Sequence, residues 1–185
     1  MSDKTQIKTP DERMIEFCYS SLGFSFTPLD GKAPKYKAWA RAPHETLSMS
    51  LCWARTTNIG VRTGSNSVCP VTGRHLIVFD LDSYKPQYDV ARVKALNLRL
   101  WPTVTAATGN GGYHLFYWLP FGMQAGNTNG TILPAVDTRA TGGQVVFPGS
   151  IHPDTNRRYQ WMQGRDPMSI ELAELPPILI NLIIR

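Results

Sequence analysis

Residues 75–82 read His-Leu-Ile-Val-Phe-Asp-Leu-Asp, and this stretch decides the expected fold. Its apolar run is rich in β-branched and aromatic residues, which predicts a strand buried on both faces. The strand ends in Asp80 and Asp82. Because strand side chains alternate between faces, both carboxylates project from one side, roughly 6–7 Å apart at the backbone. Such a pair favours a divalent cation, Mg²⁺ or Mn²⁺. The alternative is a strand that simply ends in two solvated acids.

The composition of the chain is that of an ordinary globular domain. The 185 residues carry a formal net charge of +5, which suits a polyanionic partner. The three cysteines, Cys18, Cys52 and Cys69, form no disulfide framework. Cys69 and His75 lack two further ligands at regular spacing, so zinc is not expected. The polar N-terminus contains no secretory signal, and no apolar run is long enough to span a membrane. The expected location is therefore the cytoplasm.

Around the central strand, the pattern predicts further strands and helices. Two hairpins are expected, one at Asn110-Gly111 and one at Gly142-Gly143. The predicted helices lie at 10–22, 89–98 and in the apolar tail 170–184, and the predicted strands at 58–64, 103–108, 113–119, 136–139, 144–147 and 157–161, with a polar loop at 65–73.

A basic turn with interleaved aromatic residues precedes these strands. Its cations are Lys32, Lys35 and Lys37, and its aromatic residues are Tyr36 and Trp39. Lysines among aromatic side chains can hold phosphates and stack bases. A solvated surface loop would have the same composition, so both interpretations stay open.

Three acids and one histidine share a chemical interpretation. Asp80 and Asp82 end the central strand, His114 follows a glycine-rich turn, and Asp137 lies in a later strand. Two-metal phosphoryl or nucleotidyl transfer needs about three carboxylates to hold two cations. A histidine beside the phosphates can donate a hydrogen bond to developing charge. Separately, Asp137 could be a turn acid and His114 a buried strand histidine.

These residues resemble three motifs of one family. The family is the bifunctional DNA primase–polymerase (Prim-Pol) domains of the archaeo-eukaryotic primase superfamily, found in replication proteins of plasmids and phages. Its first motif, apolar residues followed by Asp-x-Asp/Glu, is similar to residues 76–82. Its second, small-x-His, is similar to Gly112-Tyr113-His114, and its third, apolar-Asp, to Val136-Asp137. The resemblance covers roughly residues 10–180, and the family more often has Ser at the position of Gly112.

The resemblance implies a fold and a set of site residues. The fold would be α+β, with an RRM-like antiparallel catalytic sheet flanked by helices and a smaller N-terminal αβ lobe. The metal ligands would be Asp80, Asp82 and Asp137, with His114 contacting the nucleotide phosphates as part of the catalytic set. Weaker candidates are Arg62, Arg139, Ser150 and His152 for the nucleotide and Lys32, Lys35 and Lys37 for DNA.

The resemblance also implies an activity and partners. We expect a nucleotidyltransferase that uses two Mg²⁺ or Mn²⁺ ions and nucleoside triphosphates. It would make or extend primers on a single-stranded DNA template in replication of a phage or mobile element. Residues 1–185 would be the Prim-Pol catalytic domain at the N-terminus of a longer replication protein that also contains a helicase domain.

Two other classes of protein are compatible with parts of the pattern. A non-catalytic RRM-like module would bind nucleic acid without metal. A haloacid-dehalogenase-type phosphatase or a glycosyltransferase would share the Asp-x-Asp element. However, this phosphatase usually has Gly-Thr where this chain has Ser83-Tyr84. Three acids facing a phosphate backbone also argue against the simple binding module, because carboxylates repel phosphates unless a cation intervenes.

Overall fold

The computed structural model describes residues 10–97 and 102–183 and confirms the expected α+β class. Strands outnumber helices and pair in the antiparallel sense within two sheets. The elements are α1 (Pro10–Leu22), β1 (Ser25–Asp30), β2 (Ala33–Pro34), the 3₁₀ turn η1 (Trp39–Arg41), α2 (Leu47–Thr56), β3 (Asn58–Arg62), β4 (Gly64–Val68), β5 (His75–Leu81), α3 (Val90–Ala95), β6 (Thr105–Ala107), β7 (Tyr113–Trp118), β8 (Val136–Arg139), β9 (Gln144–Val146), β10 (Gln160–Trp161) and α4 (Pro177–Ile183).

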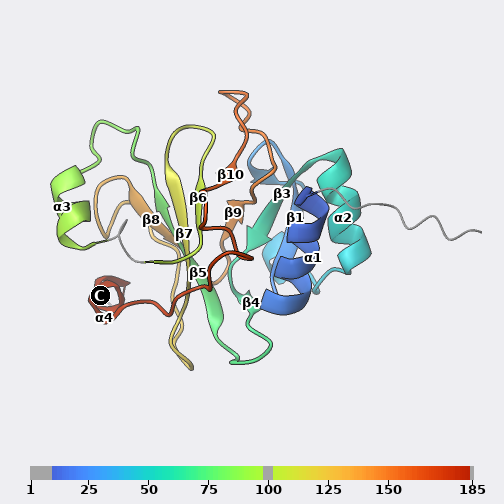
Figure 1. Ribbon diagram of the computed structural model, residues 1–185, viewed down its shortest axis with the longest axis horizontal. Coiled ribbons are helices and arrows are strands. Elements are labelled where there is room, and N and C mark those ends of the chain that lie inside the picture. The colour runs from blue at the N-terminus through green and yellow to red at the C-terminus, as the bar shows by residue number, and fades with distance from the viewer. Residues whose placement is uncertain (1–9, 98–101, 184–185) are drawn as a thin grey trace, which may run out of the picture.

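The smaller sheet has the order β2-β1-β3-β9 and carries α1 and α2 beside it (Figure 1). Helix α1 ends where predicted, at Leu22, and Gly23 continues the chain with a φ of 68°. This sheet differs from the expected N-terminal lobe in one respect. Its last strand, β9, comes from residues 144–146, so the lobe is completed late in the chain.

The larger sheet has the order β10-β6-β7-β5-β4, and β8 pairs with the other end of β5. Figure 1 shows β5 at its centre, with α3 and α4 on the side away from the smaller sheet. Strand β5 therefore has β7 along one edge and both β4 and β8 along the other. This places the predicted central strand at the middle of the protein.

Alternate residues of β5 serve different parts of the molecule. Ile77, Phe79 and Leu81 pack in a core with Val93 of α3 and Leu179 of α4. On the opposite face, Leu76 and Val78 join a second core, to which both sheets and α1 contribute. Asp80 continues this second face. The prediction of a strand buried on both faces is therefore confirmed, and the acids lie where its inner apolar stripe ends.

One of the two predicted hairpins is wrong. The turn at Asn110-Gly111 does join two paired strands, β6 and β7. Around Gly142-Gly143, however, β8 pairs with β5 in the larger sheet while β9 pairs with β3 in the smaller one. The glycine turn thus carries the chain between sheets. Thr63 fastens this crossing, because its backbone N–H donates to Gly143 O at 3.0 Å and its hydroxyl to Ala140 O at 2.6 Å.

Other predicted elements change in extent. The polar loop expected at 65–73 contains β4, because small polar side chains such as Ser67 are buried through hydrogen bonds. Only residues 160–161 of the strand expected at 157–161 pair in the sheet. The helix expected at 89–98 spans Val90–Ala95 behind the cap Asp89, and residue 98 lies outside the described residues. Over 10–97 and 102–183, no helix combines the length and the apolar character that crossing a membrane requires.

Candidate active site

Strand pairing brings together the residues predicted from three separate motifs. Asp80 of β5 lies directly opposite His114 of β7 on one side and Asp137 of β8 on the other. Residues directly opposite in an antiparallel pair share a face of the sheet. Asp82, two residues after Asp80, follows on that same face. One row across three strands thus holds His114, Asp80 and Asp137, and Asp82 lies beside the middle of this row.

Basic side chains hold the three acids in the structure. Arg139 Nη2 lies 3.1 Å from Asp137 Oδ2 and 3.8 Å from Asp80 Oδ2. Lys85 Nζ lies 2.5 Å from Asp82 Oδ2, and the backbone N–H of Gly130 donates to Asp137 Oδ1. Among the described residues, no three His, Cys, Asp or Glu side chains converge closely enough to hold a metal ion. The carboxylates are on neighbouring strands, but each turns toward a basic side chain or a backbone donor.

Burial and neighbouring charges shift the pKa values of Asp80 and His114. Burial raises the pKa of Asp80, and the neighbouring Asp82 and Asp137 add to this, while His114 and Arg139 oppose it. Burial lowers the pKa of His114, although Asp80 and Asp82 favour its charged form. His114 Nε2 lies 3.5 Å from Asp80 Oδ1. The structure therefore favours a neutral imidazole beside a carboxylate that ionises less readily than usual.

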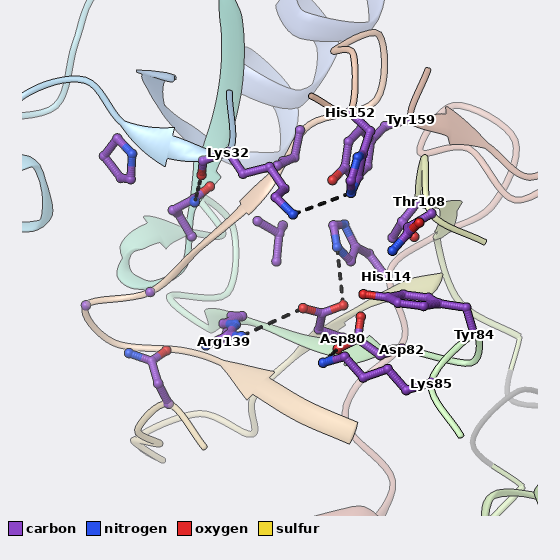
Figure 2. A pocket seen from close by; sticks show the side chains of 18 of the residues that line it. Lys32, Asp80, Asp82, Tyr84, Lys85, Thr108, His114, Arg139, His152 and Tyr159 are labelled. Atoms are coloured by element: carbon purple, nitrogen blue, oxygen red, sulfur yellow. Dashed lines mark hydrogen bonds and ion pairs between the residues drawn. The ribbon is translucent and has the colours of Figure 1, made fainter. Parts of the chain in front are cut away.

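The row faces a cavity of about 460 Å³ between the two sheets (Figure 2). The larger sheet and its loops contribute Asp80, Asp82, His114 and Arg139, and the smaller sheet contributes β9 and the segment after β1. This volume is in the range of sites for drug-sized ligands, which also includes a nucleotide. The lining residues include Lys32, Pro34, Trp39, Asp80, Asp82, Tyr84, Lys85, Thr108, Asn110, His114, Asn127, Arg139, Gly142, Gly143, Gln144, Val145, Val146, His152 and Tyr159.

A column of rings continues from His114 to the smaller sheet. The ring centroids of His114 and Tyr159 are 5.9 Å apart, and those of Tyr159 and His152 are also 5.9 Å apart. Lys32 Nζ lies 3.4 Å from His152 Nε2 and 3.5 Å from Asp154 Oδ2. A dashed line marks the contact between Lys32 and His152 in Figure 2. Burial and the nearby Lys32 lower the pKa of His152. Lys32 and the two imidazoles thus line one wall of the cavity.

Several predicted site residues lie outside this cavity. The Ser150 hydroxyl bonds with the backbone N–H and carbonyl of Ile59. Arg62 is 2% exposed and donates to the backbone carbonyls of Ala42 and Pro43. Lys35 and Lys37 are exposed on the segment after β2. The cavity therefore brings together Lys32, Asp80, Asp82, His114, Arg139 and His152, while Asp137 contacts Arg139 beside it.

Sequence reasoning missed other side chains that line the cavity. Tyr84 and Lys85 lie two and three residues after Asp82, so their position after the first motif was an available signal. Thr108 follows β6 and Tyr159 precedes β10, and only tertiary folding brings these two positions to the same cavity. Gly112 allows close packing here. A Cβ added at Gly112 would lie 2.4 Å from Leu81 O. The backbone N–H of Gly112 donates to Thr108 Oγ1 at 2.9 Å. The hydroxyl near this turn therefore comes from Thr108.

We predict that acidification destabilises the metal-free protein through His114. The folded state keeps this imidazole neutral below its ordinary pKa of 6.5, whereas the unfolded chain binds a proton there. The free energy of unfolding should fall as pH drops from about 6.5 toward the lowered pKa, by at most about 1.4 kcal/mol per pH unit for one group. The lowered pKa of His152 likewise reduces the free energy of unfolding as pH falls. The raised pKa of Asp80 acts oppositely, adding stability as pH falls toward 3.8.

Urea unfolding in EDTA at several pH values between 7.5 and 5.5 checks this prediction. His114→Gln should flatten the slope, because the amide does not titrate. His44→Gln is the matched control, since His44 is half exposed. A slope that His114→Gln leaves unchanged would contradict the prediction.

Comparison with known proteins agrees with the motifs. A model of the family described as bifunctional DNA primase/polymerase, N-terminal (Prim-Pol), matches residues 16–178. The match spans most of the chain and includes the three motifs. The resemblance inferred from the sequence is therefore confirmed. No curated protein matched the sequence.

Proposed function

The chain belongs to the family of bifunctional DNA primase/polymerase N-terminal domains, and we propose that its cavity performs metal-dependent nucleotidyl transfer on a single-stranded DNA template. Membership implies DNA primase/polymerase activity. The metal requirement, the template and a role in phage or mobile-element replication belong to the proposal. We also propose that residues 1–185 form the catalytic domain of a longer replication protein with a helicase. The observation that carries the catalytic assignment is the pairing of Asp80 with both His114 and Asp137.

The acids fit hard divalent cations in donor type, and their strands place them next to one another, although in this structure each carboxylate turns toward a basic side chain or a backbone donor. Three carboxylates on neighbouring strands supply the oxygen donors that Mg²⁺ and Mn²⁺ prefer. Burial raises the pKa of Asp80, and repulsion from Asp82 and Asp137 adds to this; bound cations would relieve both effects. We propose Asp80, Asp82 and Asp137 as the ligands. When bound, the ions would activate the attacking hydroxyl and neutralise the leaving pyrophosphate. Arg139 and Lys85 neutralise the acids in the ion-free protein.

Basic and imidazole side chains on two sides of the cavity suit a triphosphate. Arg139 and Lys85 lie beside the acids, and Lys32 and His152 lie across the cavity from them (Figure 2). A neutral imidazole at His114 can donate one N–H hydrogen bond to phosphate without adding positive charge. We propose that these side chains orient the triphosphate against the acids. Arg62 and Ser150 are not included, because their polar groups bond with the protein backbone.

The proposed reaction joins a hydroxyl to the incoming nucleotide. The oxygen of a primer 3′-hydroxyl, or of a first nucleotide, attacks the α-phosphorus. A new P–O bond forms as the hydroxyl loses its proton to solvent, the α–β phosphoanhydride bond breaks, and pyrophosphate leaves with its electron pair. The chain itself holds the acids, His114 and the basic side chains around one cavity. This arrangement positions the reacting groups before the reaction begins.

Synthesis on single-stranded DNA with labelled nucleotides tests the proposal. The full chain is incubated with Mg²⁺, with Mn²⁺ or with EDTA, each with and without an annealed primer. We expect metal-dependent products at least in the primed reactions. Products formed without a primer would show that this chain also initiates primers. DNA binding with no product under any condition would overturn the catalytic assignment and favour a non-catalytic nucleic-acid module.

We predict that His114→Ala lowers nucleotide incorporation about a hundred-fold. Removing one preorganised donor from a reacting group typically costs a factor of about 10²–10³. The loss should be accompanied by a higher apparent KM for the nucleotide, because the side chain faces the cavity. Steady-state primer extension over a range of nucleotide concentrations measures both values. His44→Ala, at a half-exposed histidine outside the cavity, is the control. Unchanged kcat and KM in His114→Ala would remove it from the site.

A further inference from the structure

A basic, aromatic arm borders the mouth of the cavity. We define the arm as residues 31–43, which run from the β1–β2 turn through η1. Trp39, Lys32 and Pro34 of the arm line the cavity wall. Lys35, Tyr36 and Lys37 lie between these lining residues along the chain and are exposed to solvent. The arm is therefore continuous with the proposed active site and extends beyond it.

The arm is fastened to the smaller sheet at both ends. At its start, Asn58 Nδ2 donates to Gly31 O and Gln144 Nε2 to Lys32 O, both at 2.9 Å. At its end, Arg62 donates to the carbonyls of Ala42, at 2.7 Å, and Pro43, at 3.1 Å. These contacts fix the arm's backbone relative to the cavity.

Asn66 adds a third fixed point, because its Nδ2 donates to Ala40 O at 3.1 Å. Ala38 has a φ of 58°, in the left-handed region that residues other than glycine seldom occupy. This turn separates Lys37 from Trp39. Side-chain hydrogen bonds from Arg62 of β3 and Asn66 of β4 thus hold an unusual backbone shape at the point where the arm meets the cavity.

The exposed side chains of the arm are not used by the fold. Tyr36 is 56% exposed and belongs to neither core. Within residues 10–97 and 102–183, neither Lys35 nor Lys37 forms an ion pair with an acid. Arg41 adds a further exposed cation at the end of η1. A fixed surface that combines free cations with an exposed ring and a cavity-lining indole suits a ligand with phosphates and flat bases.

We propose that the arm is a binding platform for single-stranded nucleic acid entering the cavity. Lys35 and Lys37 would contact backbone phosphates, and Tyr36 and Trp39 would stack on bases. Arg62 acts as a positioning residue, because it holds the carbonyls at the arm's end. This inference rests on the proposed function and deepens it by naming the surface that holds the strand.

Binding of a fluorescein-labelled single-stranded oligodeoxynucleotide, followed by anisotropy in EDTA, tests the arm. We expect Tyr36→Ala and Trp39→Ala each to weaken binding about five-fold or more, since stacking contributes about 1–3 kcal/mol per base. The double variant Lys35→Ala/Lys37→Ala should weaken binding and reduce the slope of log K against log salt by about 1.4, for two lost phosphate contacts. Thermal unfolding identifies variants that keep the fold.

Matched controls separate the arm from general effects. Phe121→Ala removes an aromatic ring that is 77% exposed outside the cavity lining, and Arg92→Ala/Lys94→Ala removes two exposed cations on α3. These controls should bind as the wild type does. Folded arm variants that bind with wild-type affinity, controls that lose as much, or a wild type that does not bind the oligonucleotide would each overturn the platform. Failure of the proposed function would appear separately, as wild-type protein that binds but makes no metal-dependent product.

Discussion

Replacing Asp80 with asparagine should lower DNA synthesis about a thousand-fold and leave the fold intact. The amide keeps the size of the carboxylate but loses the anionic oxygen that a divalent cation needs. Metal ions supply several kcal/mol of transition-state stabilisation, and each 1.36 kcal/mol corresponds to a factor of ten in rate. Asp82→Asn and Asp137→Asn should have effects of similar size, because Asp137 lies opposite Asp80 and Asp82 follows Asp80 on the same face.

Primer extension at saturating nucleotide measures the loss, and Asp89→Asn is its matched control. Asp89 caps α3 by accepting the N–H of Arg92 at 3.0 Å, a role that asparagine performs equally well. This variant should extend primers at the wild-type rate. If any one of the three site variants extended primers normally, that acid would be removed from the ligand set.

A second readout distinguishes lost chemistry from lost structure. Burial beside two other acids raises the pKa of Asp80, so its charge is unfavourable in the folded, metal-free protein. Asp80→Asn should therefore unfold at the same temperature as the wild type or higher in EDTA. Added Mn²⁺ should stabilise the wild type, because it binds the folded state, and should stabilise the variant less. A large drop in unfolding temperature in EDTA would show that Asp80 is needed for the fold itself.

Arg62→Met should lower the free energy of unfolding by about 3–5 kcal/mol. The guanidinium lies 3.8 Å from the buried carboxylate of Glu45 and donates to two backbone carbonyls. Methionine fills similar space but leaves Glu45 without its positive partner, which is the costly way to break a buried ion pair. Glu45 still accepts from Phe26 N and Ser25 Oγ, so its side chain stays held in its buried position. Burial lowers the pKa of Arg62, and Glu45 opposes this shift.

Urea unfolding at pH 7 measures the effect, with Arg158→Met as the matched control. Arg158 also lies near an acid, Asp11, at 4.0 Å, but the two side chains are 50% and 65% exposed. An exposed pair of this kind contributes about 1 kcal/mol or less. The family resemblance makes Arg62 a candidate nucleotide contact. Wild-type stability combined with a raised KM for the nucleotide would favour that role over the structural one.

The central part of the candidate site was accessible from the sequence. The apolar run before Asp80 required a buried strand, and its alternation required Asp82 on the same face. His114 followed from a hairpin signal that proved correct, so its strand was expected beside other strands. The structure adds the register, which places His114 and Asp137 opposite the same residue. Local signals were sufficient here because each motif lies within one strand or one tight turn.

The rest depended on contacts that local patterns do not encode. The glycines at 142–143 have the composition of a hairpin turn, yet the chain crosses between sheets there. The crossing is fixed by the pairing of β9 with β3 and by the hydrogen bond from Thr63 to Ala140 O. Both involve residues distant in sequence. The surroundings of Arg62, which the family resemblance makes a candidate nucleotide contact, depend on distant residues as well. Only tertiary folding brings Glu45 and the carbonyls of the arm to it.

The late arrival of β9 makes the order of synthesis matter for this protein. The smaller sheet begins at the N-terminus, but its edge beside β3 stays open until residues 144–146 have been made. Ser150 then closes the same edge by bonding the backbone of Ile59, 91 residues earlier. A nascent chain therefore exposes an unpaired strand edge while most of the domain is translated, and such edges recruit other strands. Pairings this distant also slow folding. During translation, the vulnerable part of the molecule is the lobe that is synthesised first.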